Sequence, residues 1–280
     1  MTDHRPVELI SQAFGFESTA IHSMSVSPWS TVCRVESASH PPYVAKTGPF
    51  EILNAERQSL LLLRATNTVP IPELLGFEMI GNQGVLLLES LKRGSRPDWS
   101  RFAADLAALH RPGPETRYGF TIDTYLGSTL QVHSWCDDWI DFNRCFRHGP
   151  LLQSVNLGEK ECALVESAVD SFTDFLGQPR PGLIHGDLWS GNAIPLIDGS
   201  VALIDPAPSY GDPLADIAMM KLFGGFPETF FDLYHAESGI EPEERTLAAY
   251  RLYHALNHLR LFGQGYRSMV LREARLILDG

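Results

Sequence analysis

The 280-residue sequence predicts an α+β chain with a small β-rich N-terminal lobe that contains one helix, followed by a larger, mainly helical C-terminal lobe. Two observations predict this fold. Residues 30–89 contain short extended runs separated by turn residues, whereas residues beyond 91 carry apolar side chains at helical spacing. The change of character places the lobe boundary near residue 90. We therefore expect one lobe over residues 1–90 and a second over residues 91–280.

The N-terminal lobe is built from four extended runs and one helix. Runs at 30–37 and 42–46 are rich in β-branched or aromatic residues and predict strands. Apolar side chains recur at helical spacing over 50–66, and the sequence V-P-I-P at 69–72 ends this helix because proline cannot continue it. Runs at 74–80 and 84–89, joined by G-N-Q-G, predict a hairpin.

The C-terminal lobe is predicted mainly from one-faced apolar stripes. Such stripes over 99–110 and 163–176 predict two helices. Residues 244–278 are helical in pattern apart from G-Q-G at 263–265, which should divide them into two helices. Two short apolar runs, 183–185 and 201–205, predict strands that enclose a polar segment at 186–192.

Composition and charge disfavour several classes of protein. Acidic residues outnumber basic ones by 34 to 22, and the resulting net charge of −12 disfavours a broad grip on nucleic-acid phosphates. The longest apolar runs are too short to cross a bilayer, and the N-terminus has no signal-peptide pattern. Four cysteines, none in a CxxC pair, disfavour a disulfide scaffold or a cysteine-ligated zinc site. We expect a cytoplasmic protein with reduced thiols.

The motif that carries chemistry is L-I-H-G-D-L-W-S-G-N at 183–192, followed by V-A-L-I-D at 201–205. Asn192 comes five residues after Asp187, and Asp205 comes eighteen after it. Phosphoryl transfer uses one carboxylate to accept the proton of the attacking hydroxyl, and a second carboxylate with an amide oxygen to hold Mg²⁺ against the nucleotide phosphates. Protein kinases space these groups in the same way. The alternative is a polar turn between two core strands.

An upstream lysine and glutamate complete the pattern. Lys46 ends the run P-Y-V-A-K, and Glu56 lies on the helix that follows. Taken singly, they would be an edge-strand residue and a solvated helix residue. Their order before the His-Gly-Asp motif favours an ion pair that presents the lysine to ATP phosphates. Residues 86–91 lie where the two predicted lobes meet, so we expect them to form the hinge between the lobes. Backbone groups around Glu89 and Leu91 would there form hydrogen bonds with adenine.

With these residues in place, the sequence resembles the fructosamine kinase (ketosamine 3-kinase) family over almost its whole length. This family is a branch of the aminoglycoside-phosphotransferase-like, protein-kinase-like fold. The resemblance rests on five blocks: H-G-D-L-W-S-G-N at 185–192, D-P-A-P-S-Y-G-D at 205–212, L-F-G-G-F at 222–226, Y-G-F-T-I-D-T-Y-L-G-S-T-L-Q at 118–131 and the segment 139–152.

The resemblance implies a nucleotide-binding lobe over residues 1–90, a catalytic and substrate-binding lobe over residues 91–280, and a role for each motif residue. Asp187 would be the catalytic base for a sugar hydroxyl, and Asn192 and Asp205 would bind Mg²⁺. Lys46, held by Glu56, would contact the phosphates of ATP. Trp189 would be a platform for the ketosamine, where an indole face attracts a protonated amine by about 0.5–2 kcal/mol. The alternative for Trp189 is a core aromatic residue that anchors the lobe.

Two further motif residues have supporting roles in this interpretation. Asp216, in A-D-I-A at a helix start, resembles a residue that braces the catalytic loop in kinase folds. His185 is expected to position the same loop rather than take part in the chemistry.

One loop departs from the family's pattern. The nucleotide loop, which usually bears glycine, reads S-V-S-P-W-S-T at 25–31. Glycine lets backbone approach phosphate closely, and Pro28 has no amide proton to donate. The sequence therefore predicts weaker retention of ATP by this loop, or retention chiefly by serine hydroxyls.

The sequence supports one main functional hypothesis and leaves two others open. The main one is an ATP- and Mg²⁺-dependent kinase of the 3-hydroxyl of ketosamines, on small amines or on protein lysines, which would serve in deglycation repair. The alternatives are a kinase of another amino-alcohol, such as an aminoglycoside or choline, and a pseudokinase that binds nucleotide without catalysis. The expected partner is the small-molecule or protein-bound ketosamine. Neither nucleic acid nor membrane is expected to bind, and the chain would be a monomer or a weak homodimer.

Overall fold

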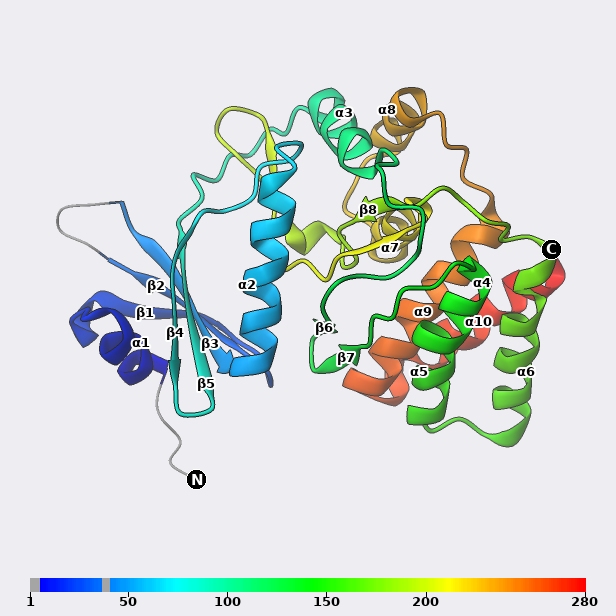
Figure 1. Cartoon of the computed structure of the whole chain (residues 1–280), viewed down its shortest axis with the longest axis horizontal. Helices are drawn as coiled ribbons and strands as arrows, with labels where there is room; N and C mark the ends of the chain where they lie inside the picture. Colours follow the sequence, from blue (N-terminus) through cyan, green and yellow to red (C-terminus); the bar gives the residue numbers. More distant parts are fainter. Residues whose placement is uncertain (1–5, 37–40) are drawn as a thin grey trace. The chain divides into compact units, whose positions relative to one another are not determined.

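The computed structural model describes residues 6–36 and 41–280, and its chain divides into two compact units (Figure 1). The first unit comprises Met1–Pro97 and Ile194–Asp205, and the second comprises Asp98–Ala193 and Pro206–Gly280. The first is β-rich and the second mainly helical, which confirms the predicted fold class. The separate nucleotide-binding and catalytic roles of residues 1–90 and 91–280 stay predictions.

An antiparallel five-stranded sheet forms the body of the first unit, in the order β1-β2-β3-β5-β4. Its strands are β1 (Ile21–Val26), β2 (Thr31–Val35), β3 (Tyr43–Pro49), β4 (Leu74–Ile80) and β5 (Gln83–Glu89). The hairpin predicted between β4 and β5 is confirmed, with Ile80 opposite Gln83. The predicted strand at 30–37 is confirmed over β2, and Ser37 lies outside the described residues.

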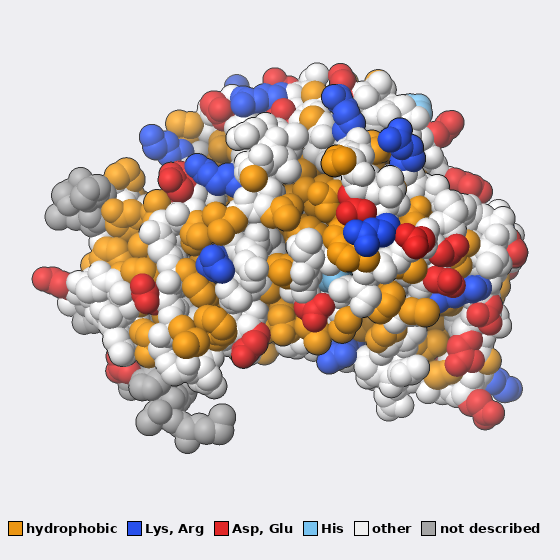
Figure 2. Space-filling model, in the orientation of Figure 1, with side chains coloured by type: hydrophobic (Ala, Val, Ile, Leu, Met, Phe, Trp, Pro, Cys, Tyr) orange, Lys and Arg blue, Asp and Glu red, His pale blue; other side chains and the backbone are white. Residues whose placement is uncertain are grey.

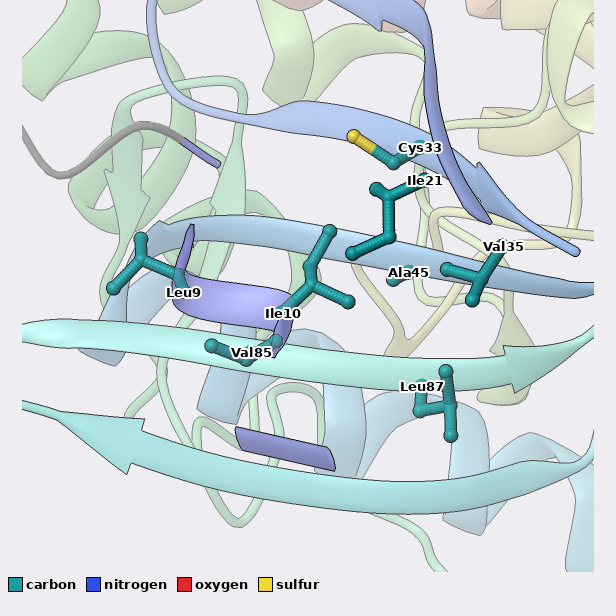
Figure 3. Packing of buried hydrophobic residues seen from close by; sticks show 8 residues of the cluster. All are labelled: Leu9, Ile10, Ile21, Cys33, Val35, Ala45, Val85 and Leu87. Carbon is teal, nitrogen blue, oxygen red and sulfur yellow. The ribbon is translucent and has the colours of Figure 1, made fainter. Parts of the chain in front are cut away.

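Two helices belong to this sheet, and they cover opposite faces. The predicted helix is α2 (Phe50–Ala65), whereas α1 (Pro6–Phe14) was not predicted. Leu9 and Ile10 of α1 pack in one core cluster with Cys33, Ala45 and other strand residues (Figure 3). Successive strand residues face opposite sides of a sheet, so Lys46, next to Ala45, points to the α2 face. The buried Cys33 thiol is therefore on the other face, and burial raises its pKa.

A segment from late in the sequence completes the first unit. β9 (Ala193–Pro195) and β10 (Val201–Leu203) form a two-stranded sheet. Leu196 bridges Arg93, and the Leu203 amide donates to the carbonyl oxygen of Pro70 at 2.9 Å. These contacts attach the strand that precedes Asp205 to the sheet-bearing unit.

The second unit is a set of helices with two small strand pairs, β6–β7 and β8–β11. The helix predicted over 99–110 is confirmed, and so is the division after Phe262. The helix predicted over 163–176 is confirmed only in part, because α6 starts at Glu159 and ends at Asp170, where a 3-10 turn follows. One helical run, residues 139–154, contains a π-helical turn at Arg144–His148. The elements of the unit are α3 (Trp99–His110), β6 (Thr124–Leu126), β7 (Thr129–Gln131), α4 (Trp139–Asn143), α5 (Gly149–Ser154), α6 (Glu159–Asp170), β8 (Gly182–Ile184), β11 (Ser209–Gly211), α7 (Leu214–Phe223), α8 (Glu228–Ser238), α9 (Glu244–Phe262) and α10 (Arg267–Asp279).

The surface carries charges of both signs. Figure 2 shows acidic and basic side chains interspersed with apolar ones over the visible face. Within the described ranges, none of the helices combines the length and apolar character needed to span a bilayer.

Candidate active site

Lys46 lies at the centre of a buried ionic cluster in the first unit. Its side chain on β3 is 7% exposed, and its Nζ donates to both oxygens of Glu56 on α2, at 2.7 and 2.8 Å. The same Nζ donates to Asp205 Oδ1 at 2.8 Å. The structure therefore brings together three residues that the sequence singled out, although Asp205 is 159 positions from Lys46.

Charge pairing keeps this lysine protonated. Burial alone would lower the pKa of Lys46, but the carboxylates of Asp205 and Glu56 more than offset burial and raise it. The pKa of Glu56 is raised by burial and by the negative charge of Asp205, with Lys46 acting in the opposite direction. All three donors of this lysine contact carboxylates, so binding phosphate oxygens would require it to exchange one of these contacts, and the phosphate-binding role stays a prediction.

Asp205 follows β10 with a left-handed backbone, φ +55°. Few residues other than glycine adopt this conformation, and aspartate is among those that tolerate it best. Its side chain is 45% exposed, so one carboxylate oxygen is bound to Lys46 while the group remains open to a ligand. A metal-binding role fits this placement and stays a prediction.

In the second unit, the loop after β8 is fixed by Asp216 of α7. One oxygen of Asp216 accepts from the His185 amide at 2.7 Å, and the other accepts from the Gly186 amide at 2.9 Å. His110 also contacts Asp216, with 3.0 Å between Nε2 and Oδ2. Although burial acts to raise the pKa of Asp216, the hydrogen bond and charge of His110 together with the His185 contacts lower it. The expected bracing role of Asp216 is confirmed.

Gly186 is required by the geometry of this loop. Its φ is +82°, and a side-chain carbon there would lie 2.0 Å from the carbonyl oxygen of Ala207. The buried His185 accepts the Asp187 amide on Nδ1 at 3.3 Å, which agrees with a positioning role. The loop thus holds Asp187 by its backbone.

Asn192 holds Asp187 from the other side. Its Nδ2 donates to the Asp187 carbonyl at 2.9 Å and to Asp187 Oδ2 at 3.2 Å. Because Nδ2 is used in this way, the amide oxygen of Asn192 faces elsewhere. Mg²⁺ prefers oxygen ligands, so the amide oxygen of Asn192 and the carboxylate of Asp205 are chemically suited to hold it.

Trp189 is a surface residue, and its role as a platform for the ketosamine stays a prediction. It is 41% exposed, which excludes a core anchor. A side-chain carbon at Gly191 would lie 2.3 Å from its indole ring, so glycine makes room for the ring. A side-chain carbon at Gly225 would lie 2.5 Å from Ser190, which places the L-F-G-G-F block beside the tryptophan loop.

The expected hinge lies at the end of β5. The Glu89 amide donates to the Glu73 carbonyl at 3.0 Å, and Glu89 Oε1 accepts the Glu73 amide at 2.8 Å. The Glu89 amide is therefore already engaged, so a bond from Glu89 to adenine would have to use its carbonyl. The roles of Glu89 and Leu91 remain predictions.

The loop between β1 and β2 is a closed turn that uses its own polar groups. Ser27 donates its amide to the Ser30 carbonyl at 2.8 Å, and its hydroxyl accepts the Ser30 amide at 3.0 Å. The Trp29 amide lies 3.4 Å from the same hydroxyl. A side-chain carbon at Gly48 would lie 2.5 Å from the Trp29 carbonyl oxygen, so the turn lies close against β3.

Three buried residues of the second unit had no role in the sequence analysis. Gln131, Arg147 and Tyr253 belong to one hydrogen-bonded network beside the His-Gly-Asp loop. Gln131 and Arg147 fall in blocks that carry the family resemblance, which is the signal that could have pointed to them. Tyr253 lies in no such block.

Comparison with known proteins identifies the family. The model of the family described as "Fructosamine kinase" matches residues 7–279. The chain belongs to the fructosamine kinase family. It is therefore a phosphotransferase that uses ATP.

Individual relatives agree with this family. A "Probable ketoamine kinase" of Synechocystis is 38% identical over 224 residues, which cover 78% of this chain and 76% of the relative. A chloroplastic "Protein-ribulosamine 3-kinase" of Oryza sativa subsp. indica is 34% identical over 81% of this chain and 68% of its own. The crystal structure of a "putative fructosamine-3-kinase" from Thermobifida fusca has a TM-score of 0.85 and 27% identity, covering 98% of both chains.

Proposed function

We propose that this protein transfers the γ-phosphoryl group of Mg·ATP to the 3-hydroxyl of a ketosamine. The proposal is supported by the relatives, which are described as ketoamine and ribulosamine 3-kinases. The observation that carries it is the placement of Asp187, whose loop is fixed by Asp216 and whose carboxylate is held by Asn192. We assign to that carboxylate the role of receiving the proton of the acceptor hydroxyl.

The reaction balances with Asp187 as the base. The substrate oxygen forms a bond to the γ-phosphorus, and the bond from that phosphorus to the bridging oxygen of ADP breaks. The hydroxyl proton passes to the Asp187 carboxylate. General-base assistance of this kind contributes about 10²- to 10⁴-fold in rate.

The remaining residues act on the nucleotide. Lys46, held by Glu56, would bind phosphate oxygens. Asn192 and Asp205 would hold the Mg²⁺ of Mg·ATP, whose charge offsets that of the phosphate oxygens. Backbone groups of Glu89 and Leu91 would bond adenine.

Trp189 would receive the acceptor. A ketosamine carries a protonated amine next to its sugar, and an exposed indole face attracts such a cation. The indole also offers apolar area to the sugar carbons. Aminoglycosides and choline carry cationic nitrogen as well, so the acceptor is best decided by direct assay.

The first experiment measures acceptor-dependent ATP consumption with Mg²⁺, using a small ribulosamine and a small fructosamine, in the wild type and in Asp187→Asn. We expect turnover in the wild type and a roughly 10²- to 10⁴-fold fall in the variant, with nucleotide binding nearly unchanged. Asp170→Asn, the same change at an exposed residue of the same unit, is the matched control and should keep full activity. Full activity of Asp187→Asn would reject the assignment.

A second variant tests the metal assignment. Asp205→Ala should abolish Mg²⁺-dependent ATP binding, measured by titration calorimetry with and without the metal. Unchanged metal dependence would reject Asp205 as a ligand. Wild-type turnover with aminoglycoside or choline but with no ketosamine would replace the proposed substrate class.

A further inference from the structure

A chain of buried hydrogen bonds runs through the second unit toward the His-Gly-Asp loop. Arg147 Nη2 contacts His133 Nδ1 at 3.1 Å, and His133 Nε2 contacts Thr124 Oγ1 at 2.9 Å. Thr124 Oγ1 donates to Gln131 Oε1 at 2.8 Å, and Gln131 Nε2 donates to the Tyr253 hydroxyl at 2.7 Å. Five side chains from four segments of the sequence are thereby linked in series.

Arg147 sets the direction of every bond in this chain. A guanidinium only donates, so His133 Nδ1 must accept and Nε2 must carry the proton. Burial first, and then the charge of Arg147, lower the pKa of His133 to about 2, so the ring is neutral. Nε2–H therefore donates to Thr124, and the threonine hydroxyl must then donate to Gln131 Oε1. This fixes the orientation of the Gln131 amide, whose nitrogen donates to Tyr253.

The geometry of Arg147 suits this directing role. Its side chain is 6% exposed, and its guanidinium lies 4.5 Å from the centre of the Phe142 ring. It sits in the π-helical turn of the run 139–154, and such turns are frequent at functional sites. A buried cation at one end of a chain of hydrogen bonds polarises each bond along it. The terminal hydroxyl, that of Tyr253, becomes a stronger donor as a result.

The Tyr253 oxygen already accepts a hydrogen bond from Gln131, so the Tyr253 proton is directed away from Gln131 and the other members of the hydrogen-bond chain. A cavity of about 30 Å³, room for one or two waters, is lined by Gln131, Tyr253, His254 and Gly186 of the catalytic loop. Burial and the negative charge of Asp187 raise the pKa of Tyr253, so the hydroxyl and this carboxylate lie within electrostatic reach. Gly186 is joined by a peptide bond to Asp187, so Tyr253 and the neighbour of the base line one small cavity. Asp216 also lines this cavity, but its oxygens already accept from the amides of His185 and Gly186.

We propose that Tyr253 is a positioning residue that donates its hydroxyl proton to the carboxylate of Asp187, directly or through one cavity water, and so orients the base toward the acceptor hydroxyl. The inference rests on the proposed function, because it takes Asp187 as the base. The chain from Arg147 to Gln131 exists to keep the Tyr253 proton directed outward.

The test compares Tyr253→Phe with Tyr250→Phe in the full-length enzyme. Tyr250 lies on the same helix and lines the same cavity, but its hydroxyl donates to Asp212 at 2.6 Å and takes no part in the hydrogen-bond chain from Arg147 to Tyr253. We expect Tyr253→Phe to lower kcat by roughly 10- to 100-fold, the value of a hydrogen bond to a charged group, with the KM values for ATP and ketosamine within about threefold of wild type. Tyr250→Phe should lower the Tm but keep kcat within about twofold.

A second variant tests the direction of the hydrogen bonds while keeping the Tyr253 hydroxyl. In Gln131→Glu the new carboxylate can only accept, so Tyr253 would donate to residue 131 and withdraw from Asp187. We expect the same fall in kcat as for Tyr253→Phe, and no further fall in the double variant.

The outcomes separate this inference from the proposed function. A kcat of Tyr253→Phe within about twofold of wild type, with Asp187→Asn inactive, would overturn the role of Tyr253 and leave the proposed function standing. Full activity of Asp187→Asn would instead reject the base assignment itself. If Gln131→Glu fails to fold, the comparison of Tyr253→Phe with Tyr250→Phe decides alone.

Discussion

At the scale of single residues, Lys46 depends on its two carboxylates. A buried ammonium without them would lose its proton or leave the interior. We expect Lys46→Met to lower kcat/KM for ATP at least about 100-fold, because an oriented charge on the phosphates is removed. Glu56→Gln keeps a hydrogen-bond acceptor and leaves Asp205 in place, so its loss should be smaller, about tenfold. Steady-state kinetics at varied ATP would check both, and an unaffected Lys46→Met enzyme would contradict the assignment.

Ser27 is predicted to matter far less for ATP. Its hydroxyl accepts the Ser30 amide inside the turn and is already used there. We therefore expect Ser27→Ala to change the KM for ATP by no more than about threefold, while the Tm falls slightly because a turn hydrogen bond is lost. This outcome would separate the loop from the phosphate-binding groups. A large rise in KM would show that the serine hydroxyl binds the nucleotide, the alternative that the sequence left open.

At the scale of secondary-structure elements, close glycine contacts position the acceptor platform. A methyl group at Gly191 would lie 2.3 Å from the indole of Trp189, so Gly191→Ala must displace the ring. We expect the KM for ketosamine to rise about tenfold with the KM for ATP unchanged, because the cation–π contact is lost. Gly113→Ala is the matched control, since no atom lies within 4 Å of the added methyl group. Equal KM values in both variants would exclude Trp189 from the acceptor site.

Some elements and contacts of this structure could be predicted from the sequence, and others could not. The Lys46–Glu56 pair was predictable because a strand leads directly into a helix. Helix α1 was missed although its apolar residues lie on one face, because its nine residues are fewer than the stretch over which helical spacing is normally recognised. The ion pair of Lys46 with Asp205 depends on β10 joining the first unit, a contact that no local pattern encodes. The chain that ends at Tyr253 is likewise tertiary, since its members lie up to 129 positions apart.

At the scale of the whole molecule, the burial of histidine links stability to pH. His254 is 4% exposed, and burial lowers its pKa to about 3, helped by the charge of His258. Unfolding returns its pKa to near 6.5. Its contribution to stability is complete above about pH 6.5 and is lost as the pH falls toward 3, because the unfolded chain then binds a proton that the folded chain does not. Glu56, with its raised pKa, acts in the opposite direction over part of this range.

A comparison with His254→Gln isolates the histidine from these other groups. The free energy of unfolding of both proteins would be measured by urea titration at pH 7.5, 6.5 and 5. Relative to the variant, the wild type should lose about 2 kcal/mol between pH 6.5 and pH 5, because each pH unit below 6.5 costs about 1.4 kcal/mol per proton bound. The slope with urea should not change, since the fold buries the same surface in both proteins. A difference that stays constant with pH would mean that His254 binds its proton equally in the folded and unfolded chains.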